Sequence, residues 1–195
     1  MGDMHVMRLV GGHPAVDFVN TLGGRKDMPD DEYLHTYGDL LIWSERTGLI
    51  AHEHAGILAR TADRRAHAAA TVLATARELR GHVDAILRAT LEERSPRAAD
   101  LDAVRRAGVD ALAHAALTPH LAWTWTGTEL ERPLWPLAHS VLDLLQGQPL
   151  DRLGECERCR WLFVDSSANR SRRWCSMEAC GAIEKMRRHR AKNIS

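Results

Sequence analysis

The chain has 195 residues, 45% of them hydrophobic and 27% charged, which fits one globular domain or one domain with a small appended module. The first residues lack the basic-then-apolar pattern of a secretory signal, and no apolar stretch approaches the roughly 18 residues that span a bilayer. We therefore expect a cytoplasmic protein without a membrane segment, whose thiols stay reduced. No P-loop, strand-linked GxGxxG or GxSxG motif is present, so we expect a protein that is not an enzyme.

The formal net charge of zero hides an uneven distribution. Residues 156–195 contain ten Lys and Arg against four Asp and Glu, a net charge of +6, whereas residues 1–155 carry a net charge of −6. An acidic body with a basic tail indicates a polyanionic partner for the tail. A merely solvated basic end would give the same charge count.

The first half of the chain is predicted to be mainly helical. Residues 5–10 (HVMRLV) alternate like a short strand and are followed by two glycines. A helix is expected over 36–47, because Gly48 followed by an apolar residue is a common helix stop. Apolar residues three or four apart over 52–94 predict one or two long amphipathic helices.

The second half adds two helices and a strand. Ser95 and Pro96 are typical of a helix start, and we expect that helix to run to about residue 117. Leu121, Trp123 and Trp125 alternate like a strand, and the tryptophans are expected to lie in the core. A further helix over 134–146 should end at Gly147, with residues 146–149 as a linker. The predicted fold is mostly α with a few short strands (α+β).

All four cysteines lie in one short window, with the spacing C-x2-C-x15-C-x4-C: Cys156, Cys159, Cys175 and Cys180. Two cysteine pairs at about this separation bind one zinc ion tetrahedrally, and four thiolates leave no open position for water, so the ion is structural. An α-helix places residues i and i+5 poorly, so we expect a turn within 176–180. A redox Cys-x-x-Cys site and a disulfide framework are the alternatives, both less favoured.

Cations surround the predicted metal site. We expect them to contact nucleic acid: Arg170, Arg172, Arg173, Lys185, Arg187, Arg188, Arg190 and Lys192. Lys185, Arg188 and Lys192 would form one stripe of a basic helix after Cys180. Ala182, Ile183 and Met186 would form an apolar stripe that packs on the zinc knuckles.

The segment "CERCRWLFVDSSANRSRRWCSMEACG…KMRRHRAK" closely resembles the CGNR-type zinc finger. The upstream "GGHPAVDFVNTL" resembles the amino-terminal signature of the ABATE domain that usually precedes this finger. The resemblance covers nearly the whole chain and implies a stress-related transcription regulator of bacteria, with a DNA-binding finger and a helical sensing or regulatory domain. The chain has Gly181, Ala182 and Ile183 where the family name specifies Gly, Asn and Arg, which puts the strength or specificity of DNA binding in question.

The ABATE-like signature contains four polar residues in an otherwise apolar stretch: His13, Asp17, Asn20 and Thr21. They are candidates for an effector pocket, although a structural role in capping local elements is the favoured interpretation.

The resulting hypothesis divides the chain into a helical regulatory domain over 1–147 and a zinc finger over 152–195 that contacts double-stranded DNA. A small-molecule effector is a further expected partner, and the oligomeric state stays open, a homodimer included. The alternative is a zinc-stabilised module that docks an acidic protein partner.

Overall fold

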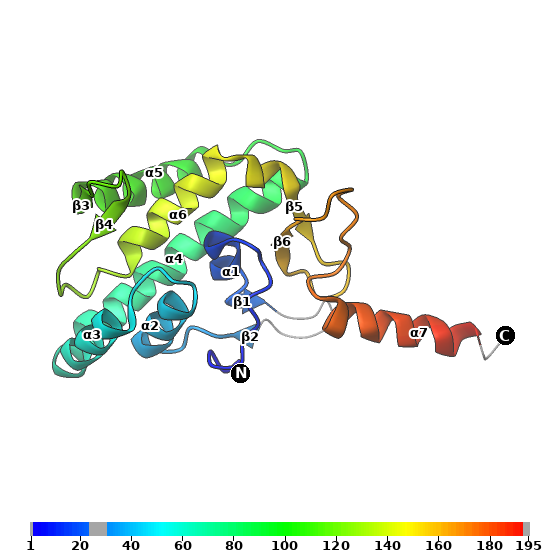
Figure 1. The fold of residues 1–195 in the computed structure, drawn as a ribbon, viewed down its shortest axis with the longest axis horizontal. Coiled ribbons are helices and arrows are strands. Elements are labelled where there is room, and N and C mark those ends of the chain that lie inside the picture. Colours follow the sequence, from blue (N-terminus) through cyan, green and yellow to red (C-terminus); the bar gives the residue numbers. More distant parts are fainter. Residues whose placement is uncertain (1, 24–30, 193–195) are drawn as a thin grey trace.

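The computed structural model describes residues 2–23 and 31–192 of the chain. Three helices lie side by side and form the framework of the body: α4 (Ala66–Leu91), α5 (Ala98–Ala113) and α6 (Leu134–Gln146). Figure 1 shows α2 (Tyr37–Arg46) and α3 (His52–Arg64) at one end of this framework. The short α1 (Pro14–Val19) contacts α4 and α6 on one side and a strand of the zinc module on the other. The predicted mostly α fold with a few short strands is confirmed.

The long helices bury apolar faces with helical spacing. In α4, Val72, Ala76, Leu79, Val83 and Leu87 are all buried, as their three- and four-residue intervals predict. The predicted helix over 36–47 is present as α2, and Thr36 and Asp39 cap it reciprocally in a capping box. Residues 52–94 form two helices, α3 and α4, which also agrees with the sequence pattern.

The expected strand over residues 5–10 is wrong. Residues 4–6 form a turn, and residues 7–10 continue without regular secondary structure. Arginine side chains, rather than a neighbouring strand, bind the carbonyl groups of this segment: Arg46 donates hydrogen bonds to Met4 O and Met7 O, and Arg172 donates one to Val10 O. Of residues 5–10, only Met7 is buried, Leu9 and Val10 are half-buried and Val6 is 73% exposed, so the apolar residues do not form the single buried face of a strand.

The helix expected from Ser95 to about residue 117 is shorter at both ends. It begins at Ala98, with Arg97 rather than Ser95 at the N-cap position, and it ends at Ala113. Residues Ala115–Leu117 form β3 instead, which pairs antiparallel with β4 (Trp123–Trp125) in the register Ala115 to Trp125. The predicted strand near 121–125 is therefore present as β4. Its partner, β3, lies in residues that were expected to belong to the preceding helix.

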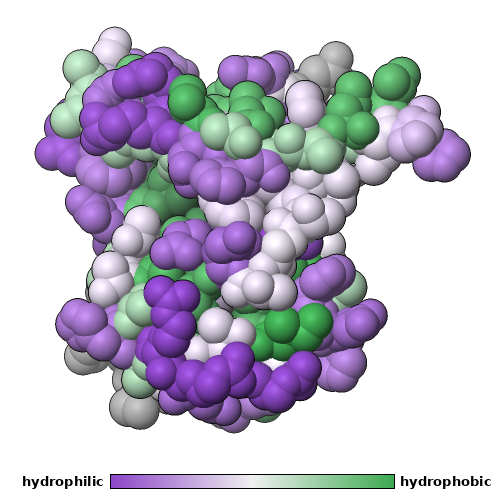
Figure 2. Space-filling model, turned by 90° about the vertical axis from the view of Figure 1, so that its left-hand side faces the viewer, coloured by the Kyte–Doolittle hydropathy of each residue, from purple (hydrophilic) through white to green (hydrophobic). Residues whose placement is uncertain are grey.

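This hairpin leaves apolar side chains exposed at the end of the body. Trp125 and Trp135 are buried as expected, but Trp123 is 45% exposed. Further apolar residues of α5 and the hairpin are exposed as well: Val109, Leu112, Leu117 and Leu121. Figure 2 views this end of the molecule, where apolar patches lie along the upper part and hydrophilic residues along the lower rim.

Residues 146–149 do not form an extended linker. Gln146 ends α6, and a short 3-10 helix, η1 (Gln148–Arg152), follows and leads directly into β5 (Leu153–Glu155). β5 pairs antiparallel with β6 (Leu162–Val164), and β6 contacts α1. The chain then forms η2 (Met177–Gly181) and α7 (Ala182–Lys192).

Two further short strands, β1 (Leu22–Gly23) and β2 (Asp31–Glu32), pair antiparallel beside α1. None of the helices within 2–23 and 31–192 combines the length and the apolar character that crossing a membrane requires.

Candidate metal centre and nucleic-acid interface

The first cysteine pair lies in the turn of the β5–β6 hairpin. Cys156 follows β5, and its backbone N–H donates to Trp161 O at 2.8 Å while its carbonyl accepts from Arg160 N at 3.1 Å. Arg160 has a φ of +64°, so the chain turns back sharply between the two cysteines. This tight turn brings the thiols of Cys156 and Cys159 together, as the Cys-x2-Cys spacing predicts.

The second pair is joined by a single turn of π-helix, η2. The amide of Gly181 donates to Ser176 O at 3.0 Å, a bond across five residues, and the side chain of Ser176 caps the start of the turn. The five-residue step from Cys175 to Cys180 suits this wider turn, whereas an α-helix would carry the two thiols apart. The expected turn within 176–180 is thus helical, and of the π type.

The four sulfur atoms all lie within 4.8 Å of one another. The Sγ atom of Cys175 is 3.5 Å from that of Cys159 and 3.6 Å from that of Cys180. A zinc–sulfur bond of about 2.3 Å requires tetrahedral sulfur–sulfur distances of about 3.8 Å, which these separations approach. All four cysteines are free of disulfides, and four thiolates would complete the coordination of the ion. The cluster therefore fits one structural Zn²⁺.

Burial raises the pKa of the Cys180 thiol, and the neighbouring Cys156 adds to this effect. Four thiolates held this close repel one another unless a cation lies between them. A bound divalent cation supplies that charge and favours the deprotonated thiols. The cysteine cluster is consequently stable as a thiolate site only with a metal ion.

Few apolar residues surround the cysteines. Phe163 and Trp174 are buried with Cys156, Cys175 and Cys180, and Val10 packs against them from the amino-terminal segment. Gly181 permits close packing here, since a Cβ at this position would lie 2.9 Å from the Sδ atom of Met177 and 3.2 Å from Trp174. So small a core cannot hold the module together without the metal.

The four polar residues of the amino-terminal signature all make internal hydrogen bonds. His13 caps α1 by accepting from Ala15 N, and Thr21 donates to Phe18 O and accepts from Arg80. Asn20 is 1% exposed and bonds both backbone groups of Leu162, donating to its carbonyl at 2.9 Å and accepting from its amide at 2.8 Å. Asn20 thus joins the body to β6 of the zinc module.

Asp17 fixes the loop that precedes α1. Its Oδ1 accepts from Gly11 N at 2.7 Å, and Gly11 O in turn accepts from Val164 N at 2.7 Å. Burial raises the pKa of Asp17 to about 6, although the Gly11 hydrogen bond and the charge of Arg172 oppose this shift. Gly12 has a φ of +73° and lies against Val164, where a side chain would be strained and crowded. These residues build the surface on which the zinc module docks.

Arg172 has a structural position rather than an exposed one. Its guanidinium donates to Trp174 O at 3.1 Å, Val164 O at 3.3 Å and Val10 O at 2.8 Å, and also to Cys175 O. It also stacks on the Phe163 ring at 4.3 Å. Four of its five N–H donors are occupied by backbone carbonyls of the module and the amino-terminal segment. This geometry disfavours the expected contact of Arg172 with DNA.

Other predicted cations of the loop are exposed. Arg173 pairs with Glu157 through two hydrogen bonds of 2.6 and 2.7 Å and lies over the Trp174 ring. Arg170 is exposed and has a φ of +50°. Both therefore remain at the surface beside the metal centre.

The basic helix α7 packs against η2 and makes no other substantial contact among the described elements. Figure 1 shows it projecting away from the body. Lys185, Arg187 and Arg190 are exposed, and Arg187 lies 4.0 Å from Glu184. The side chains of Arg188 and Lys192 lie outside the described part of the structure, so the stripe that they would form with Lys185 stays a prediction.

The expected apolar stripe of α7 is only partly buried. Met186 is 54% exposed, while Ala182 and Ile183 are half-buried in the first turn. Beyond its first turn, which packs against η2, the helix carries so few apolar residues that it has no face to bury, and it projects away from the module.

One cation at this surface has no signal in the sequence. Arg8 is exposed, and its Nη1 donates to Ser176 Oγ at 3.1 Å. It lies 168 positions before its partner, in a segment whose charge pattern is unremarkable, so only the fold brings it to the zinc module.

Comparison with known families agrees with this geometry. A zinc-finger family model, "CGNR zinc finger", matches residues 152–193, the segment that holds the four cysteines. A second, ABATE, described as "Putative stress-induced transcription regulator", matches residues 12–148. A search of curated proteins finds no match to the chain. Because the ABATE match covers more than half of the chain, and a zinc finger with one structural Zn²⁺ site follows it, the protein belongs to the ABATE family.

Proposed function

We propose that the protein is a DNA-binding transcription regulator of the cytoplasm, whose zinc module contacts DNA and whose helical body regulates that contact. The observation that carries this proposal is the position of α7. A basic helix whose one substantial contact among the described elements is with η2, and which exposes Lys185, Arg187 and Arg190, can enter a groove of DNA. No catalytic chemistry is required of it.

The zinc module supplies the rigid base for this helix. Cys180 is the penultimate residue of η2, and α7 begins at Ala182 without a break. Metal coordination therefore fixes where α7 starts and in which direction it points. Exposed Arg170 and Arg173, in the loop before Cys175, add phosphate contacts beside the helix.

The body offers a separate place for a small-molecule effector. A hollow of about 310 Å³ between α4, α5 and α6 is lined by polar and aromatic residues over an apolar floor, among them Glu78, His82, Asp110 and Trp135. Its size is within the range of small-ligand sites. α1 contacts α4, α6 and β6, so a ligand that shifts α4 or α6 would act on the zinc module through α1.

Selection of bound sequences from random duplex DNA by the zinc-loaded protein tests the proposal. The matched control lacks residues 182–195, which removes α7 and leaves all four cysteines in place. We expect the full chain to enrich one preferred sequence and the shortened chain to enrich none. If neither binds any duplex at low salt, the proposal fails, and binding of an acidic protein by α7 becomes the better account.

A further inference from the structure

A hollow of about 520 Å³ lies on the surface of the zinc module, at the foot of α7. Residues 165–167 and 171–177 line it, and most of them carry hydroxyl or guanidinium groups, including Ser166, Ser171, Arg172, Arg173 and Ser176. Groups of this kind, hydroxyls beside arginines, are the ones that commonly bind phosphate oxygens.

The one carboxylate in this lining has hydrogen-bond donors of its own. Asp165 is 6% exposed, and its two oxygens accept from Ser167 N at 2.8 Å and from Arg172 N at 2.9 Å. Hydrogen bonding to Ser167, opposed by burial, holds the pKa of Asp165 below its usual range. The ionised carboxylate thus organises the loop, and both of its oxygens already accept hydrogen bonds from backbone amides.

Donors remain available at the rim of the hollow. Ser176 Oγ accepts from Arg8 at 3.1 Å and from Ala179 N at 3.3 Å, which leaves its own O–H to donate outward. Arg173 uses Nε and Nη2 for Glu157 and keeps Nη1. Within the described residues, Nε and Nη2 of Arg8 have no acceptor, and this side chain is exposed.

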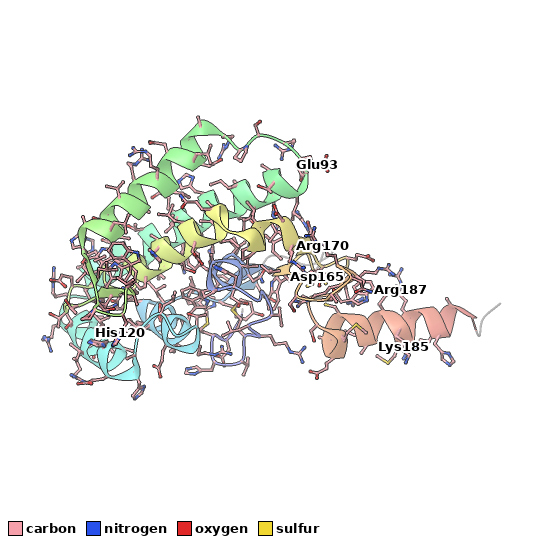
Figure 3. All side chains as sticks on the ribbon, turned by 45° about the horizontal axis from the view of Figure 1, so that its top comes forward. Glu93, His120, Asp165, Arg170, Lys185 and Arg187 are labelled. Carbon is pink, nitrogen blue, oxygen red and sulfur yellow. The ribbon has the colours of Figure 1, made fainter. Side chains whose placement is uncertain are left out.

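The direction of α7 places this hollow along the same surface as the basic helix. In Figure 3, Arg187 lies on the side of α7 that faces Arg170 and Asp165, whereas Lys185 lies on the opposite side. Met177, the first residue of η2, contributes to the rim and links the hollow to the start of the helix. A DNA strand that follows Arg187 toward the module would therefore pass the hollow.

We propose that this hollow holds one backbone phosphate of DNA, and that Arg8 of the amino-terminal segment is one of its donors together with Arg173 and Ser176. The inference rests on the proposed function and extends it, because it assigns a DNA contact to a residue outside the zinc finger. Arg8 reads no base; it fixes the position of the module on the duplex. The body then takes part in binding directly, and any shift of the amino-terminal segment alters DNA affinity.

Arg8→Ala in the full zinc-loaded chain tests this inference, with Arg60→Ala as the matched control. Arg60 is an exposed arginine of α3, at the opposite end of the molecule, and its removal changes the net charge equally. The slope of log affinity against log salt should become shallower by about 0.9 with Arg8→Ala and stay unchanged with Arg60→Ala. In ethylation-interference experiments, one phosphate whose modification prevents binding of the wild type should no longer matter for the Arg8 variant. The zinc content of both variants should equal that of the wild type.

Two results would overturn the inference, and they are distinguishable. If Arg8→Ala keeps the wild-type slope and footprint while Arg187→Ala with Arg190→Ala flattens the slope, the protein binds DNA but the hollow holds no phosphate. If the wild-type chain binds no duplex at all, the proposed function itself fails, and this inference fails with it.

Discussion

The helical body buries large apolar side chains such as Trp43, Phe18 and Leu137 in one continuous core, whereas the cluster around the cysteines has, among the described residues, Phe163 and Trp174 as its only other buried side chains. The body can therefore fold on hydrophobic burial, and the module depends on its metal ion. The two are nevertheless joined without a flexible connection, because Leu162 of β6 belongs to the core of the body and Asn20 bonds its backbone. Loss of the metal ion is therefore expected to disturb the contacts between β6 and the body as well.

The largest expected effect comes from removing a metal ligand. Cys159→Ser should abolish zinc binding and unfold residues 153–192, since binding of a structural zinc contributes about 10 kcal/mol or more to folding. The helices of the body should keep their structure. Elemental analysis and hydrogen exchange check this: amides of α4 stay protected while those of β5 and β6 exchange rapidly.

Protection lost throughout α4 as well would show that the body cannot fold without the module. Wild-type zinc content in this variant would show that three cysteines suffice to hold the ion.

A smaller loss of folding stability is expected from substitution of Arg172, which holds the module and the amino-terminal segment together. Arg172→Ala leaves up to four buried or half-buried carbonyls without a donor, and we expect unfolding to become easier by about 2–4 kcal/mol. Arg173→Ala is the control, because that side chain is exposed and its removal should hardly change the melting temperature. Equal melting temperatures for the two variants would contradict the structural role of Arg172.

Substitutions of Asn20 test the junction between the helical body and the zinc module. Asn20→Ala removes both hydrogen bonds to Leu162 and leaves its buried backbone groups unpaired, at an expected cost of about 2 kcal/mol. Asn20→Asp keeps the acceptor for the Leu162 amide, but it buries a carboxylate and places an oxygen against the Leu162 carbonyl, so a larger loss than with alanine is expected. Chemical denaturation of the zinc-loaded proteins measures the difference. An alanine variant as stable as the wild type would show that the junction rests on packing alone.

The smallest effect is a pH dependence that arises at Asp17. Its pKa is about 6 in the folded protein and 3.8 as a model value, so the folded state binds the proton more tightly than the unfolded state. The contribution of Asp17 to stability is then largest at low pH and decreases as the pH rises through 6, by about 1.4 kcal/mol between pH 5 and 8. Asp17→Asn should remove this decrease in denaturation curves recorded across that range. A variant with the same pH dependence as the wild type would assign the titration to another group.

The sequence predicted those features that depend on local spacing. The intervals between the four cysteines predicted their common site, and the helical period of α4 predicted its buried face. Features that depend on distant partners escaped prediction. Residues 5–10 resemble a strand, but Arg46 and Arg172 bind their carbonyls. Arg172 itself resembled a DNA contact, because nothing in its neighbourhood in the sequence indicates that the carbonyl of Val10 lies within its reach.

The most direct test of the central claim is the salt dependence of duplex DNA binding by the zinc-loaded full chain. About five exposed cations around the module and along α7 should contact phosphates, so log affinity should fall against log salt with a slope near −4 to −5. Removal of zinc should abolish this binding, because the base of α7 is lost. The account predicts that steep, metal-dependent slope; no measurable binding to any duplex at low salt, or binding that is equally strong without the metal, would contradict it.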